Sequence, residues 1–364
     1  MIFSTLLLFA LTAQAQTLIH HSFESDEHGW SVMGGGGAVR MAKDRPSQRD
    51  GANSLAVDYQ YGKDLSVAVL PVEISLEKMK AIRFWVKTDI ATAVAVFLSE
   101  KKPGGDYSTY FWSPKDTWQQ VTLVPSDFTV NDGPNDPKDP NGKLDLDQIQ
   151  GIGVLDLKSI FSKAMGSQQL PFPLDAAPGS HTLLLNDFQV VTDGPAPVAA
   201  GGMVTIDDFK RPVARWLSLG GMEISVKPGD KPALEASYKQ VPGQIALLTH
   251  RLADLDLSKC ERLNFEISSK VYAQIVVSIE MAKVDGKGAR YKYVLEVDGG
   301  GKPLSVSIAA ADFVLDENSP PDAAGKFEFG RARTISILDV TGVQGAETLA
   351  NTLWVSGVQG VWGR

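Results

Sequence analysis

Apolar and polar residues alternate along many short stretches of the chain, which is the pattern of half-buried strands rather than of helices. In residues 81–87 the side chains of Ile82, Phe84 and Val86 would point to one face of a strand and the intervening residues to the other. Residues 263–267 repeat this pattern, and stretches rich in glycine, proline, asparagine and aspartate separate the strand candidates. We therefore predict an all-β chain in which antiparallel sheets pack face to face as β-sandwiches.

The chain contains an internal repeat. Residues 76–87 and 257–268 align without a gap, so that Phe84 matches Phe265. Two other landmarks of the first copy, the sequences SLAVDY and SDF, recur as ALEASY and ADF in the same order. Because several matches keep the same order, we infer that one domain has been duplicated.

A segment rich in proline, glycine and alanine lies between the copies and has no apolar periodicity, as expected of a linker. The length of 364 residues suits two domains, at roughly 100–200 residues each. We predict a first β-sandwich at residues 16–192, a linker at 193–203 and a second sandwich at 204–364.

Residues 1–15 resemble a secretory signal peptide. They contain an apolar stretch from Leu6 to Leu11, followed by Ala13 and Ala15, the small residues of a cleavage site. The apolar stretch is too short to span a bilayer, which takes about 20 residues, and no later stretch has the pattern of a membrane helix. We expect an exported protein, periplasmic or extracellular, without a membrane span.

Charge and cysteine content narrow the classes of partner. A formal net charge of −8 argues against nucleic acid and anionic membranes, because neither attracts an acidic chain. The single cysteine, Cys260, excludes an intramolecular disulfide and any paired-cysteine metal or redox site. We expect Cys260 to be buried as a small apolar side chain.

The order of the strand motifs suggests a family. The motifs that carry the resemblance are, in order, Phe23-Glu24, residues 51–57, 74–87 and 118–128, and the closing Asn186-Asp187-Phe188. This arrangement resembles the galactose-binding-like jelly roll, in particular family 11 carbohydrate-binding modules and the domain of complex I intermediate-associated protein 30. The resemblance implies a jelly-roll fold for both copies and carbohydrate binding for the first.

A sugar-binding surface needs aromatic rings that contact the C–H faces of the sugar and planar polar groups that bond its hydroxyls. If Phe84 and its alternating neighbours form the core, the residues between them face outward, as do polar residues of the strand at 54–60 and aromatic residues near position 110. The candidate ligand residues are Asp58, Gln60, Arg83, Trp85, Lys87, Tyr107, Tyr110 and Trp112. Two alternatives stay open, namely that a loop covers Trp85 and that Phe111 is the outward residue of its strand.

The resemblance also implies a structural calcium ion in the first domain, with Glu24 and Asp187 at the positions of its carboxylate ligands. The alternative is that Asp187 caps a turn and that Glu24 is merely solvated. The second copy has Gly357 at the position of Asp187 and Glu266 at that of Trp85. We therefore expect the second domain to act as a partner or scaffold rather than as a second sugar-binding site.

Catalytic motifs are missing from the sequence, which contains no H-E-x-x-H, no G-x-S-x-G, no P-loop and no cluster of cysteine and histidine. Hydrolases can act with two scattered carboxylates, so an enzyme stays open, although we expect no catalytic activity. We predict a secreted or periplasmic carbohydrate-binding protein whose first domain binds a polysaccharide or oligosaccharide. The alternative is a protein-interaction or assembly scaffold that uses the same fold without binding sugar.

Overall fold

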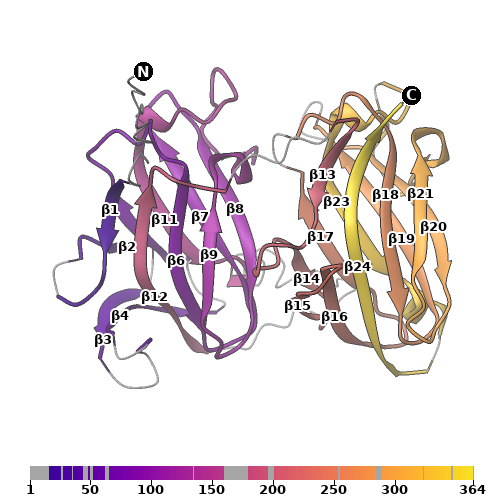
Figure 1. Cartoon of the computed structure of the whole chain (residues 1–364), viewed down its shortest axis with the longest axis horizontal. Coiled ribbons are helices and arrows are strands. Elements are labelled where there is room, and N and C mark those ends of the chain that lie inside the picture. The colour runs from indigo at the N-terminus through magenta and orange to yellow at the C-terminus, as the bar shows by residue number, and fades with distance from the viewer. Residues whose placement is uncertain are drawn as a thin grey trace, which may run out of the picture.

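The computed structural model shows two β-sandwiches arranged side by side (Figure 1). It describes residues 16–25, 28–34, 36–43, 48–49, 52–61, 65–133, 135–159, 179–195, 201–252, 255–283, 288–322, 324–345 and 347–363. The predicted signal peptide, residues 1–15, lies outside the described residues. Within the described ranges, no helix is both long and apolar enough to cross a membrane.

The first sandwich consists of two six-stranded antiparallel sheets. Its strands are β1 (Thr17–His21), β2 (Ser31–Met33), β3 (Ala38–Ala42), β4 (Ser54–Gln60), β5 (Val67–Pro71), β6 (Ala81–Thr88), β7 (Thr92–Glu100), β8 (Asp106–Ser113), β9 (Gln119–Leu123), β10 (Thr129–Val130), β11 (Ile149–Asp156) and β12 (Ser180–Val191). Sheet A has the order β3-β4-β12-β6-β9, with β1 also paired to β12, and sheet B has the order β10-β8-β7-β11-β5-β2. The short 3₁₀ helices η2 (Pro125–Asp127) and η3 (Leu146–Gln148) connect strands.

The second sandwich repeats this topology strand for strand. Its strands are β13 (Met203–Asp207), β14 (Leu217–Leu219), β15 (Glu223–Lys227), β16 (Ala233–Gln240), β17 (Ala246–Arg251), β18 (Cys260–Ser269), β19 (Ala273–Met281), β20 (Arg290–Val297), β21 (Leu304–Ala309), β22 (Val314–Leu315), β23 (Ala332–Asp339) and β24 (Leu349–Trp362), with 3₁₀ helices η4 (Ala310–Asp312), η5 (Phe329–Arg331) and η6 (Thr341–Gln344). Sheet A′ has the order β15-β16-β24-β18-β21 with β13 on β24, and sheet B′ has the order β14-β17-β23-β19-β20-β22. The predicted fold class, two tandem antiparallel sandwiches, is thereby confirmed.

Each sandwich has its own core between its two sheets, and the predicted alternation places the core residues correctly. Ile82, Phe84 and Val86 of β6 are at most 1% exposed. The Phe84 ring lies 5.9 Å from Phe111 of sheet B and 5.7 Å from Phe188 of sheet A, centroid to centroid. Large apolar side chains from both sheets therefore interlock, which is the main source of stability in such a sandwich.

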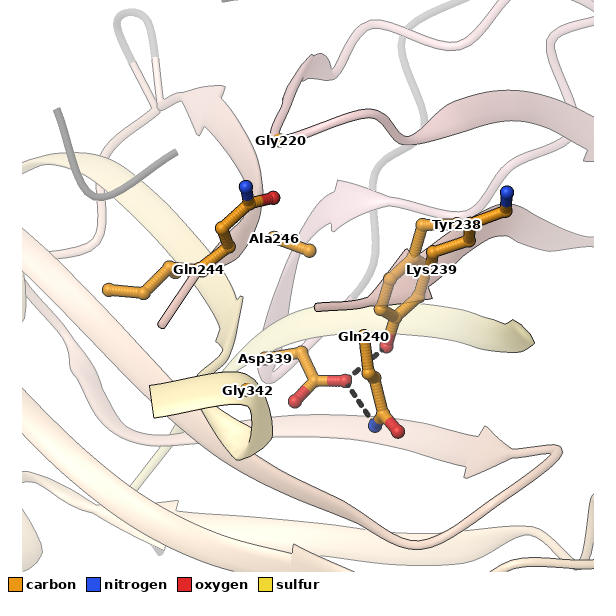
Figure 2. Close-up of a pocket in the computed structure, with 9 residues that line it drawn as sticks. Gly220, Tyr238, Lys239, Gln240, Gln244, Ala246, Asp339 and Gly342 are labelled. Atoms are coloured by element: carbon orange, nitrogen blue, oxygen red, sulfur yellow. Dashed lines mark hydrogen bonds between the residues drawn. The ribbon is translucent and has the colours of Figure 1, made fainter. Parts of the chain in front are cut away.

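A buried tyrosine–aspartate hydrogen bond joins the two sheets of each sandwich. The Tyr59 hydroxyl of β4 donates to Asp156 of β11 at 2.7 Å, and the Tyr238 hydroxyl of β16 donates to Asp339 of β23 at 2.5 Å (Figure 2). Burial and the neighbouring carboxylate raise the pKa of both tyrosines, so each hydroxyl keeps its proton and acts as a donor. This paired polar contact is a second, structural signature of the duplication.

The duplication also preserves unusual backbone conformations. Phe23 and Phe209, which occupy equivalent positions after β1 and β13, have φ of 62° and 53°. Asp187 in β12 and Gly357 in β24 have φ of 48° and 60°, and both lie where the pairing register shifts by a bulge. An aspartate and a glycine thus serve the same bulge, because both tolerate the left-handed region better than most residues.

The two sandwiches contact each other through the outer face of sheet B and the start of the second copy. Asp127 accepts hydrogen bonds from Arg211 at 2.7 Å and Arg215 at 2.5 Å, and its own side chain is only 3% exposed. The Trp112 backbone N–H donates to the Ala214 carbonyl at 2.8 Å. A desolvated carboxylate held by two guanidinium groups fixes the sandwiches relative to each other.

Candidate functional site

The outer face of sheet A carries the five residues predicted to point away from the first core. Asp58 and Gln60 of β4 and Arg83, Trp85 and Lys87 of β6 are all half-buried, while their alternating neighbours are buried. Strand β12 lies between β4 and β6, so the two groups are separated by one strand rather than adjacent. The alternation prediction thus holds for this face.

Two amide side chains flank Trp85 across the sheet. Asn186 of β12 and Gln120 of β9 pair directly with Trp85 in the strand register, so their side chains lie on the same outer face. The Arg49 guanidinium lies 3.6 Å from the Trp85 ring centroid, and the Asn186 amide donates to the Asn53 carbonyl at 2.6 Å. The connection between β3 and β4 therefore covers part of this face, which was the alternative for Trp85.

A second tryptophan on this face is missing from the predicted set. Trp118, just before β9, is half-buried and packs against a small apolar cluster of Ala42, Ala56 and Leu184. Ala56 alternates with core residues of β4 and lies outside the core, so the cluster sits on the outer face of sheet A. The sequence held the signal, because Trp118 is two residues before Gln120 and shares its face at a period of two.

Ion pairs arrange the polar groups of the face. Asp58 accepts hydrogen bonds from Arg40 and from the Thr182 hydroxyl, both at 2.7 Å. The Arg83 guanidinium donates to Asp193 at 2.7 Å, and this hydrogen bond lowers the pKa of the Asp193 carboxyl. Guanidinium, carboxylate and amide groups around two indole rings are the combination that can bind hydroxyls and stack on sugar C–H faces.

The three aromatic candidates of β8 do not join this face, because β8 belongs to sheet B. Tyr107 is fully buried, with its hydroxyl bonded to Asp139, and Phe111 also points into the core. Tyr110 and Trp112 share the outer face of sheet B, as their spacing predicts, but that face meets the second sandwich. The Tyr110 hydroxyl donates to the Thr249 carbonyl at 3.3 Å, and Trp112 is 2% exposed. The eight predicted residues therefore do not form one site.

The two predicted calcium ligands are engaged by protein donors. Asp187 Oδ1 lies 2.9 Å from His20 Nε2 and accepts from the Gln189 amide at 2.7 Å, while Glu24 accepts from the Asn53 N–H at 3.2 Å. Among the residues that the structure describes, no group of three or more His, Cys, Asp or Glu side chains could hold a metal ion. Calcium takes six to eight oxygen ligands, so these two carboxylates alone do not make a site, and the calcium ion stays a prediction.

Cys260 is buried, as predicted, and burial raises the pKa of its thiol to about 11. A thiol in this state is neutral at physiological pH and a poor nucleophile. Cys260 therefore acts as a packing residue at the start of β18.

No protein-family model and no curated protein matches the sequence. Among solved structures, the chain is similar to a family 11 carbohydrate-binding module from Clostridium thermocellum in complex with a mixed-linked tetrasaccharide (21% identity, 45% of this chain and 98% of that chain, TM-score 0.37). It is also similar to the tandem family 22 modules from Paenibacillus barcinonensis (13%, 96% and 98%, TM-score 0.32) and to a family 30 module (16%, 44% and 99%, TM-score 0.34). The predicted resemblance to family 11 is thus matched among solved structures, and the resemblance to the complex I domain stays a prediction. What those modules bind is a property of those modules.

Proposed function

We propose that the protein is a non-catalytic carbohydrate-binding protein, exported to the periplasm or beyond, and that the outer face of sheet A contacts a polysaccharide. The observation that carries this proposal is the pair of half-buried tryptophans, Trp85 and Trp118, on one sheet face among amide, guanidinium and carboxylate groups. Indole rings stack on sugar rings, and the exposed Gln120 offers a planar hydrogen-bonding group beside them.

Arg49 covers the ring face of Trp85 on which a sugar would stack. Its guanidinium occupies the ring face of Trp85 at the distance that a stacked sugar would take. A sugar that stacks on the same ring face therefore displaces Arg49, whereas Trp118 packs on the sheet without a comparable cover among the described contacts. We accordingly assign the primary stacking contact to Trp118 and a secondary one to Trp85.

The proposal is tested by native gel electrophoresis of the full chain in gels that contain hydroxyethyl cellulose, xylan, glucomannan or mixed-linkage β-glucan. At least one of these polysaccharides should retard the wild type. Trp118→Ala should raise the Kd about tenfold, because an aromatic contact of about 1.4 kcal/mol is lost. The matched control is Tyr272→Ala, which removes an aromatic side chain 43% exposed in the second sandwich. Equal retardation of Trp118→Ala and wild type would show that no sugar ring stacks on Trp118.

The scaffold alternative has one observation in its favour. Val294, Val314 and Leu315 of the paired strands β20 and β22 are 48%, 57% and 43% exposed, and β22 is an edge strand. Apolar residues gathered at a sheet edge are typical of surfaces that pair with another protein. Folded protein that no polysaccharide retards, and that co-purifies with a partner through this edge, would support the scaffold instead.

A further inference from the structure

The outer face of sheet A′ contains an open groove at the place where the first sandwich is filled. Its volume is about 410 Å³, and it lies over strands β24, β18 and β21. Most of the side chains that line it can donate or accept hydrogen bonds. Six polar residues of its lining lie on these three strands: Asn264, Glu266, Ser305, Ser307, Ser356 and Gln359.

These polar residues form two rows across three strands. Asn264 of β18 pairs with Gln359 of β24 on one side and with Ser307 of β21 on the other. The next outward residue of β18, Glu266, pairs in the same way with Ser356 and Ser305. On β18 and β21 the outward residues recur about every 6.6 Å, while on β24 the bulge at Gly357 lies between the two rows of amide, carboxylate and hydroxyl groups.

Two substitutions and a shorter connection in the second copy explain why the groove is open. Glu266 replaces Trp85, which carries Arg49 on its ring in the first copy. The connection between β3 and β4 spans residues 43–53 and places Arg49 on Trp85, whereas the connection between β15 and β16 spans only residues 228–232. Gly357 replaces Asp187, and a Cβ atom at Gly357 would meet nothing within 4 Å. The space that Asp187 and the Arg49–Trp85 pair occupy on sheet A is therefore open on sheet A′.

One polar atom of the groove residues lacks a partner. The side-chain oxygen of Asn264 is buried and accepts no hydrogen bond among the residues that the structure describes. A buried carbonyl oxygen without a donor lowers the stability of the folded state, because its hydrogen bonds to water have not been replaced. A hydroxyl group bound in the groove would supply the missing donor once the amide turns toward it.

The lining indicates a neutral ligand rich in hydroxyl groups. The Glu266 carboxylate lies 3.2 Å from the Lys231 ammonium, and Asp208, which also lines the groove, lies 3.2 Å from Lys210, so each carboxylate of the lining has a cationic partner. Trp354, outward-facing on β24 two residues before Ser356, adds a half-buried indole whose N–H donates to Glu235 at 2.9 Å. Planar polar groups in rows beside an indole ring suit a sugar chain better than an anion or an apolar peptide.

We propose that this groove is a second carbohydrate-binding site, which takes a neutral polysaccharide segment lying across β24, β18 and β21. The proposal rests on the proposed function for the class of ligand, but it assigns binding to the second sandwich, which the sequence pattern had marked as a partner or scaffold. Asn264 and Gln359 bond sugar hydroxyls, and Gly357 keeps the floor of the groove clear.

The test is the same affinity electrophoresis of the full chain with Gly357→Asp and, separately, Asn264→Ala. Gly357→Asp fills the groove with the side chain found in the first copy, where Asp187 adopts nearly the same φ, so the fold should be kept. Each variant should weaken retardation by hydroxyethyl cellulose, xylan or glucomannan at least fivefold with an unchanged Tm. If Gly357→Asp fails to fold, Asn264→Ala alone decides the outcome.

The outcomes separate this proposal from the first-sandwich face. Loss of binding in Gly357→Asp and Asn264→Ala but not in Trp118→Ala supports the groove and overturns the sheet A assignment. Loss only in Trp118→Ala overturns the groove and keeps the sheet A face. Weakening by all three variants supports both sites. A wild-type chain that no polysaccharide retards overturns the groove together with the proposed function.

Discussion

Arg49 lies over the ring of Trp85, with 3.6 Å between the guanidinium carbon and the ring centroid. This contact joins the connection between β3 and β4 to the middle of sheet A, and it covers the aromatic residue that the sequence pattern singled out. Cation–π pairs at exposed sites contribute about 0.5–1 kcal/mol, and a ligand that stacks on this face of Trp85 has to replace that contact. Arg49 thus covers part of the outer face of sheet A in the first sandwich.

Removal of this cover should strengthen binding. In Arg49→Ala a stacking ligand no longer has to displace the guanidinium, so its Kd should fall about two- to fivefold, the equivalent of 0.5–1 kcal/mol. Isothermal titration with the polysaccharide that retards the wild type measures this change. Lys326→Ala is the matched control, because it removes an exposed positive charge of the second sandwich and leaves the sheet A face unchanged. Weaker binding in Arg49→Ala would show that the arginine itself contacts the ligand.

The buried tyrosine–aspartate bonds should be needed for stability in both sandwiches. Tyr238→Phe removes the hydroxyl that donates to Asp339 and that accepts from the Asn351 amide. We expect the free energy of unfolding of the second sandwich to fall by about 1–3 kcal/mol, because buried polar groups lose a partner. Guanidinium unfolding followed by circular dichroism measures this loss, with Tyr272→Phe as the exposed control. An unchanged unfolding midpoint in Tyr238→Phe would show that the hydrogen bond between Tyr238 and Asp339 does not stabilise the second sandwich.

Asp127 should hold the two sandwiches together. Asp127→Ala leaves Arg211 and Arg215 without their shared carboxylate, and loss of one partner of a buried ion pair costs about 3–5 kcal/mol. The expected result is independent motion of the sandwiches, seen as a larger radius of gyration in small-angle scattering. Asp132→Ala breaks only the exposed pair with Lys283 and should leave the scattering curve unchanged. Superimposable curves for Asp127→Ala and wild type would contradict this role.

His250 should make the contact between the sandwiches sensitive to acid. Its imidazole is 4% exposed, bonds the Arg215 carbonyl at 2.6 Å and stacks on Trp216. Burial lowers the pKa of His250 to about 4, with the Arg215 charge also lowering it and Asp207 and Asp127 opposing.

The sign of the effect follows from this lowered pKa. The folded state disfavours the charged imidazole, so its contribution to stability is present above pH 6.5 and is lost as the pH falls from there through about 4. Thermal unfolding between pH 7 and 4 should therefore show a smaller decrease of Tm in His250→Gln than in the wild type. Parallel Tm profiles for the two proteins would contradict the assignment.

The local alternation of residues was sufficient to predict the fold class and the outward position of Trp85. Period-two patterning is a local property, so it identifies strands and their two faces directly from the sequence. It does not tell which strands pair. Tyr110 and Trp112 share a face as predicted, but β8 pairs with β7 and β10 in sheet B, so that face meets the second sandwich.

The rest of the candidate surfaces depended on contacts between distant parts of the chain. Arg49 reaches Trp85 through a connection whose path no periodicity encodes. The repeat shows Gly357 at the position of Asp187, and from the sequence alone this substitution indicates the loss of a site. The structure shows that the same substitution leaves open space above sheet A′. In the first copy the Asp187 side chain fills this space and bonds His20 and Gln189, and glycine has no side chain to take its place.

Affinity electrophoresis of the full wild-type chain against neutral polysaccharides tests the central claim most directly, with Trp118→Ala and Gly357→Asp in neighbouring lanes. The account predicts that at least one polysaccharide retards the wild type and that both variants migrate faster than it does, while Tyr272→Ala does not. Unretarded migration of folded wild-type protein in every gel would contradict carbohydrate binding and leave the exposed edge at β20 and β22 as the surface to follow.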